Sequence, residues 1–171
     1  MKLWNIKLLD NEGVVFSGAG FLSEQDAKEY VEKNPCNEGQ RWEITSEEGI
    51  KLDADRHEFF KFFNLPEKEI TEDVRFSLES LFCGQWYENP PTVINGKTYE
   101  NWDSYTISYY CDQWWACGLN KGVKINGEYY LKEIARGEGD SQIDALCSLV
   151  ILKHDLLEEE SLTWMKEVFN G

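Results

Sequence analysis

The sequence predicts an α+β fold made of antiparallel sheets with helices packed on them, in two closely associated halves. Short segments with the two-residue period of strands are combined with segments that have the 3.6-residue period of helices. Two Asn-Gly pairs, at residues 95–96 and 126–127, lie between strand-forming stretches, as in tight β-hairpins. The composition turns from helical to β-rich near residue 85, which divides the chain into residues 1–85 and 86–171.

The first half is expected to have the order ββαββαα. Residues 3–9 alternate apolar and polar side chains, which predicts a strand with one buried face. Ser23 is a suitable N-cap for a helix that ends before Pro35. Four phenylalanines between residues 59 and 63 are expected in the core of a second, short helix. The strands are predicted at residues 3–9, 14–17, 41–45 and 50–52, and the helices begin at Ser23, at Asp53 or Asp55, and at Thr71.

The second half is expected to contain hairpins followed by two helices, which begin near Ser141 and Asp155. Its main feature is the stretch from Tyr99 to Trp115, which holds seven of the chain's 24 aromatic residues. Tyrosine, isoleucine and cysteine alternate with polar residues from Tyr105 to Cys111, so this stretch is predicted to be the central strand of a sheet with one buried face.

The run from Lys124 to Asp155 is a predicted hairpin followed by the sequence GEGDSQIDALCSLVILK. It resembles the end of the β-sheet-plus-helix module of HicB-type antitoxins and of small phage sandwich-domain proteins. In those families a Gly-Asp or Gly-Thr cap also leads into an Ala-Leu helix that packs on an antiparallel sheet. The resemblance covers about a fifth of the chain. It implies a helix lying on a sheet, and it assigns a role to no individual residue.

The net charge of the chain is −15, from 17 basic and 32 acidic residues that are spread over both halves. Such a field repels nucleic acid and anionic membranes and attracts basic partners, so we expect no direct binding to nucleic acid or membrane. An ordinary acidic soluble protein is the simpler interpretation. Five scattered cysteines and a beginning that lacks a signal-peptide pattern predict a cytoplasmic protein with reduced thiols.

Acidic and aromatic residues around the aromatic stretch predict a surface that binds a basic, nucleic-acid-handling protein. Trp102, Trp114 and Trp115 would be apolar anchors, while Asp103 and Asp112 would steer the partner. The alternative is that the tryptophans belong to the core and the acids to a solvated face. The leading hypothesis is a phage-type inhibitor, immunity protein or antitoxin. Its first helix would mimic a nucleic-acid backbone with carboxylates at every third residue, Asp26, Glu29 and Glu32.

A small cysteine-dependent hydrolase or transferase is the alternative function. Cys83, His154 and Asp155 occur in the order of a nucleophile, a base and a carboxylate. Cys83 falls at the end of a predicted helix, however, where the helix dipole disfavours a thiolate. No cofactor or metal site is predicted. The run Asp53-Ala54-Asp55 begins like a calcium loop but has Glu58 where that loop requires glycine.

Overall fold

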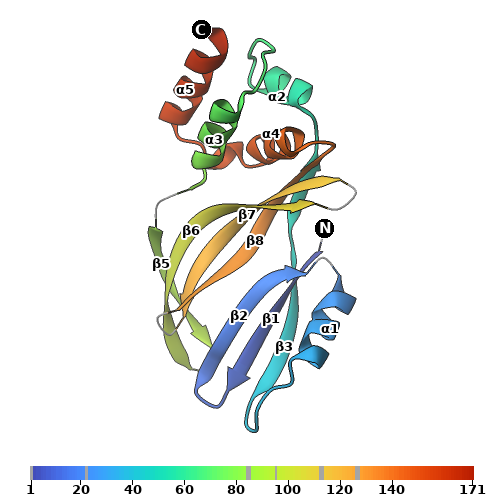
Figure 1. Ribbon diagram of the computed structural model, residues 1–171. Coiled ribbons are helices and arrows are strands. Elements are labelled where there is room, and N and C mark those ends of the chain that lie inside the picture. Colours follow the sequence, from blue (N-terminus) through green and yellow to red (C-terminus); the bar gives the residue numbers. More distant parts are fainter. Residues whose placement is uncertain (1, 22, 84–85, 95, 112–113, 126–127) are drawn as a thin grey trace. The chain divides into compact units, whose positions relative to one another are not determined.

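The computed structural model describes residues 2–21, 23–83, 86–94, 96–111, 114–125 and 128–171 (Figure 1). The order of its elements confirms the α+β class, the predicted ββαββαα order and the later hairpin region followed by helices. Within these ranges, no helix is both long and apolar enough to cross a bilayer. The elements are β1 (Lys2–Asp10), β2 (Gly13–Phe21), α1 (Glu24–Lys33), β3 (Arg41–Glu48), β4 (Ile50–Asp53), α2 (Arg56–Phe62), α3 (Glu72–Ser80), β5 (Trp86–Ile94), β6 (Lys97–Cys111), β7 (Trp115–Ile125), β8 (Glu128–Gly139), α4 (Gln142–Leu152), the 3₁₀ turn η1 (His154–Leu156) and α5 (Glu159–Asn170).

The chain forms two compact units, each assembled from three segments, and β6, β7 and β8 contribute to both. The predicted boundary near residue 85 is one of the segment ends, but the halves 1–85 and 86–171 do not coincide with the units. Unit 1 contains Met1–Gly49, Gln85–Tyr105 and Asn120–Glu133, and unit 2 contains Ile50–Gly84, Thr106–Leu119 and Ile134–Gly171.

Unit 1 contains a three-stranded antiparallel sheet in the order β2-β1-β3, and α1 packs against all three strands (Figure 1). The strand predicted at residues 3–9 is confirmed as β1, but its burial does not follow the predicted alternation, because Asn5 and Leu9 on the opposite face are also buried, with 4% and 3% exposure. Leu8 stands opposite Phe16 on one side and Trp42 on the other, so these apolar side chains share a face. The Trp42 ring also contacts the ring of Tyr30 on α1, edge to face, with 6.0 Å between the centroids.

The second sheet has five strands in the order β4-β8-β7-β6-β5. β5 and β6 are antiparallel, as predicted for the hairpin at residues 95–96, whereas β4 is parallel to β8. The antiparallel sheet expected from the sequence is therefore corrected to a mixed one. Long stretches of chain separate β4 from β8, so no tight turn forces an antiparallel direction. The turn predicted at residues 126–127 lies outside the described part of the chain.

The aromatic stretch is divided between two strands. β6 ends at Cys111 and β7 begins at Trp115, so Trp114 and Trp115 lead into a new strand. β6 lies between β5 and β7, and the middle position of the sheet belongs to β7. The strand predicted to be central is thus an interior strand beside the edge.

In unit 2, α4 packs directly on the backbone of β8 because two glycines of β8 face it. A Cβ atom on Gly137 would lie 2.1 Å from the carbonyl oxygen of Ala145, and one on Gly139 would lie 2.7 Å from the Ala145 nitrogen. The hydroxyl of Ser148 on α4 donates to the carbonyl oxygen of Ala54 and accepts from its N–H, at 2.9 Å each. These contacts hold the segment that enters α2 against α4.

Phenylalanines of α2 lie at the centre of the unit 2 core. Phe59 and Phe60 are buried, and both rings contact the ring of Phe169 on α5. Phe62, the last residue of α2, is 49% exposed, which corrects the expectation that all four phenylalanines are core residues.

Candidate acidic binding site

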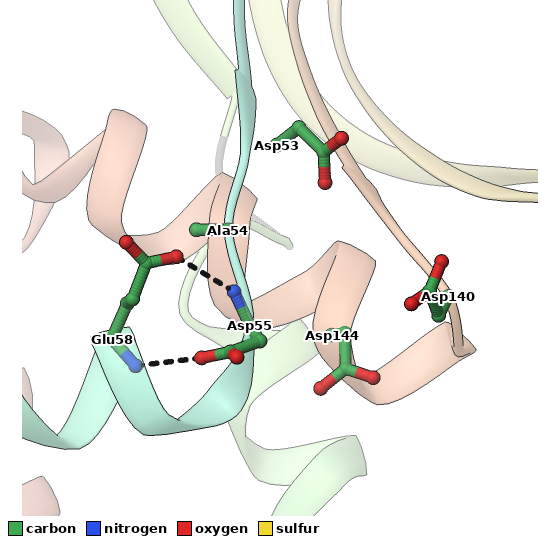
Figure 2. Close-up of a pocket in the computed structure, with 6 residues that line it drawn as sticks. All are labelled: Asp53, Ala54, Asp55, Glu58, Asp140 and Asp144. Atoms are coloured by element: carbon green, nitrogen blue, oxygen red, sulfur yellow. Dashed lines mark hydrogen bonds between the residues drawn. The ribbon is translucent and has the colours of Figure 1, made fainter.

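An open pocket of about 270 Å³ lies in unit 2 where β4 and β8 end and α2 and α4 begin. Five of the six residues that line it are acidic, and they come from two segments of the chain, residues 53–58 and 140–144 (Figure 2). The lining residues are Asp53, Ala54, Asp55, Glu58, Asp140 and Asp144.

Two of the carboxylates belong to the N-terminus of α2. The Asp55 side chain accepts a hydrogen bond from the backbone N–H of Glu58 at 2.9 Å, and the Glu58 side chain accepts one from the backbone N–H of Asp55 at 3.2 Å (Figure 2). This reciprocal capping box satisfies backbone donors that a helix start leaves open. Asp55 and Glu58 therefore have a structural role, although both remain exposed toward the pocket.

Asp144, in the first turn of α4, is the neutralised carboxylate of the pocket. It accepts hydrogen bonds from Nε of Arg56 at 3.0 Å, from the Arg56 backbone N–H at 3.1 Å and from the Ser141 hydroxyl. Burial by itself raises the pKa of Asp144, but the hydrogen bonds from Arg56 and Ser141 outweigh it and leave this pKa below its ordinary value. Asp144 is thus ionised and already paired.

Asp53 and Asp140 are the two carboxylates that remain available. Asp53 ends β4, opposite Glu138 in the parallel register, and Asp140 follows the end of β8. Both are exposed, and their side chains form no hydrogen bond or ion pair within the described residues. The nearby Lys51 binds Glu138 at 3.2 Å. The pocket therefore holds an excess of negative charge that suits a cationic group.

Trp114 is exposed at the same end of the five-stranded sheet. It directly precedes β7, a neighbour of β8, and only two residues connect β7 to β8. The start of β7 and the end of β8 consequently lie at one end of the sheet, beside Asp140. The Trp114 side chain is 44% exposed, whereas Trp115 is half-buried and contacts the ring of Tyr109. Of the two predicted anchors whose side chains are described, Trp114 is the more exposed.

The row of carboxylates predicted on the first helix, α1, is present but partly neutralised. Asp26 and Glu32 are exposed, while Glu29 is half-buried and binds Lys33 at 3.6 Å. Glu24 and Lys28 form a similar pair at 2.7 Å. These i,i+4 pairs are typical of a solvated helix face, so the row carries less net charge than its acidic residues alone suggest.

Asp103, expected to be a steering carboxylate on the surface, is instead buried in unit 1, with 3% exposure. Its Oδ2 atom lies 2.5 Å from Nζ of Lys121 on β7. Because this carboxylate is buried and paired with a lysine of the neighbouring strand, it is not available to a partner protein, and the prediction was wrong. The other two predicted contact groups, the side chain of Trp102 and the residue Asp112, lie outside the described part of the structure.

The three residues of the alternative enzyme are placed as follows. Cys83 follows α3, and burial raises the pKa of its thiol, which disfavours a thiolate. His154 Nδ1 lies 2.8 Å from the carbonyl oxygen of Ile151, and Asp155 binds Lys153 at 3.0 Å. In the described part of the chain, no hydrogen bond joins Cys83, His154 and Asp155 into a triad.

No group of histidine, cysteine and carboxylate side chains among the described residues could hold a metal ion.

The pocket was not predicted from the sequence. As candidate site residues, Asp53, Asp55 and Glu58 were considered only as part of an incomplete calcium loop, and Asp140 and Asp144 were assigned no functional role. One sequence pattern could have indicated the pocket: at two places a helix begins directly after a strand ends, and acidic residues lie at both junctions. Only the parallel pairing of β4 with β8 brings these junctions together. Comparison of the chain with protein-family models, with curated proteins and with solved structures finds no match.

Proposed function

We propose that this chain is a cytoplasmic, non-enzymatic binding protein that covers a basic surface of another protein, as phage-type inhibitors, immunity proteins and antitoxins do. The observation that carries the proposal is the pocket at the start of α2 and α4, in which Asp53 and Asp140 are exposed and unpaired among the described residues. Cys36, Cys83 and Cys147 form no disulfide in the structure, which suits a reducing compartment.

An arginine or lysine side chain of the partner is the group that fits this pocket. A guanidinium can bind a carboxylate through two parallel hydrogen bonds, and a space of about 270 Å³ can admit its planar head. Exposed ion pairs contribute only about 0.2–1 kcal/mol each, so the charges mainly raise the association rate and select a basic partner. Nucleic-acid-handling proteins are one class that presents such basic surfaces.

Trp114 supplies the apolar contact that charge alone does not. Tryptophan is over-represented among residues that dominate binding energy, because it buries a large, rigid surface when a partner covers it. Its exposure, and its position at the same end of the sheet as Asp140, support this role. We expect Trp114→Ala to weaken partner binding while leaving the free energy of unfolding unchanged within about 0.5 kcal/mol.

The test is a pull-down from a lysate of the source organism at low and then high salt, with bound proteins identified by mass spectrometry. Asp53→Lys/Asp140→Lys is compared with the parent and with the matched control Asp26→Lys/Glu32→Lys on α1. Both double variants change the net charge equally. We expect the parent and the α1 variant to retain one basic protein that dissociates as salt rises, and the pocket variant to lose it.

Two results would contradict the proposal. Equal loss of the protein from both double variants would show that net charge alone governs capture. Capture that does not respond to salt would show that the basic surface is not what the chain recognises.

A further inference from the structure

The two edge strands of the five-stranded sheet differ in how they resist pairing with another chain. β5 contains Pro90-Pro91, and its register against β6 shifts between Asn89 and Thr92. Proline lacks an N–H donor, and a register irregularity bends a strand, so both features prevent a further strand from adding at this edge.

β4, at the opposite edge, lacks these protections. Its four residues pair with β8 in an unbroken register from Ile50 to Asp53, and none is a proline. None of the four is buried, and Ile50 is 43% exposed. Lys51, the residue that could repel a basic strand, binds Glu138 on the neighbouring strand β8. An edge strand of this kind presents unpaired backbone N–H and C=O groups to solvent.

The charge beside β4 indicates which chain would pair with it. The strand runs directly into the acidic pocket, because Asp53 is its last residue and Asp55 and Glu58 follow at the start of α2. A segment lying along β4 would place its own side chains beside these carboxylates. A second copy of this chain would bring a further net charge of −15 to the same place, which disfavours self-association.

We infer that the partner adds an extended segment bearing lysine or arginine to the open edge of β4. This inference rests on the proposed function and names its binding mode. Backbone hydrogen bonds to Ile50–Asp53 supply affinity, and a basic side chain at the end of the segment enters the pocket and supplies selectivity.

The test uses an acetylated, amidated peptide of alternating lysine and valine, about eight residues long, and the same peptide with every lysine and valine backbone nitrogen methylated. Both carry the same charge, but the second cannot donate the backbone hydrogen bonds of a strand. Titration calorimetry gives the affinities, and hydrogen exchange reports on the amides of Ile50–Asp53. We expect the unmethylated peptide to bind roughly tenfold more tightly and to slow exchange in β4.

A pair of matched variants locates the binding edge. Ile50→Lys on β4 and Val93→Lys on β5 both replace an exposed apolar residue and change the net charge equally. We expect Ile50→Lys to weaken peptide binding roughly tenfold and Val93→Lys to change it less than about threefold.

The outcomes separate the two proposals. Equal binding of the methylated and unmethylated peptides would overturn strand addition while leaving recognition of basic groups intact. Binding of neither peptide would contradict the proposed function as well.

Discussion

Helix α1 and the pocket at the start of α2 and α4 are both acidic, but the pocket has the larger excess of acidic over basic side chains. The acids of α1 share one helix with Lys28 and Lys33, which bind Glu24 and Glu29 at i,i+4 spacing. The acids of the pocket come from two segments that are distant in the sequence, residues 53–58 and 140–144, and Arg56 neutralises only Asp144 directly. Acidic density along the sequence is therefore a poor guide to acidic density in space.

The largest effect is expected from Gly137→Ala, which disrupts the packing of α4 on β8 next to the pocket. The new Cβ atom would lie 2.1 Å from the Ala145 carbonyl oxygen and 2.4 Å from the Leu149 nitrogen. Both atoms belong to the α4 backbone, so the helix must move away from β8. We expect the free energy of unfolding to fall by about 3 kcal/mol or more, measured by urea denaturation followed by tryptophan fluorescence.

Gly39→Ala is the control for Gly137→Ala. Gly39 has a positive φ of 82° but no atom within 4 Å of an added Cβ, so only backbone strain of about 1–2 kcal/mol is expected. If Gly39→Ala costs as much as Gly137→Ala, the loss of stability in Gly137→Ala cannot be attributed to crowding between β8 and α4.

A smaller, pH-dependent effect is expected from Asp144→Asn. The folded-state pKa of Asp144 is lowered, since hydrogen bonds from Arg56 and Ser141 to the ionised carboxylate outweigh the opposing effect of burial. Such a group stabilises the fold above its unfolded pKa, and this contribution is lost as pH falls through the folded pKa. Asp144→Asn should therefore cost about 1.5 kcal/mol at neutral pH, and the difference from the parent should shrink below about pH 4.

Asp26→Asn on α1 provides the comparison for Asp144→Asn in the same urea titrations at neutral and acidic pH. Asp26 is exposed and has no basic partner among the described residues, so its replacement should change stability little at either pH. If the loss in free energy of unfolding caused by Asp144→Asn stays constant down to about pH 3, the bond to Arg56 does not depend on ionisation of the carboxyl group.

The smallest effect is expected from Lys33→Gln, which removes one i,i+4 pair on α1. The side chain of Lys33 is 75% exposed, and that of Glu29 is 47% exposed. Solvent screens such a pair, so the free energy of unfolding should change by less than about 0.5 kcal/mol in urea denaturation. A larger loss of free energy of unfolding that added salt reduces would show that the α1 ion pairs contribute substantially to stability, which would contradict this expectation.

Local features of the fold could be predicted from the sequence, while the site could not. The N-caps predicted at Ser23 and Ser141 and the helix start predicted at Thr71 are confirmed, and of the two alternatives Asp53 and Asp55 the N-cap is Asp55. These features are local, because a capping bond spans only three residues. The last helix begins at Glu159 and not near Asp155, because η1 comes first. The burial of Asp103 against Lys121 depends on strand pairing, which alternation alone does not specify.

The most direct test of the central claim is an NMR titration of the isotopically labelled protein with a short arginine peptide at low salt. We expect the largest shifts at the backbone amides of residues 53–58 and 140–144, and small shifts at those of α1, Glu24–Lys33. This result would place cation binding in the pocket. Shifts of equal size on α1 would contradict the account, because they would show that the whole acidic surface attracts arginine without a preferred site.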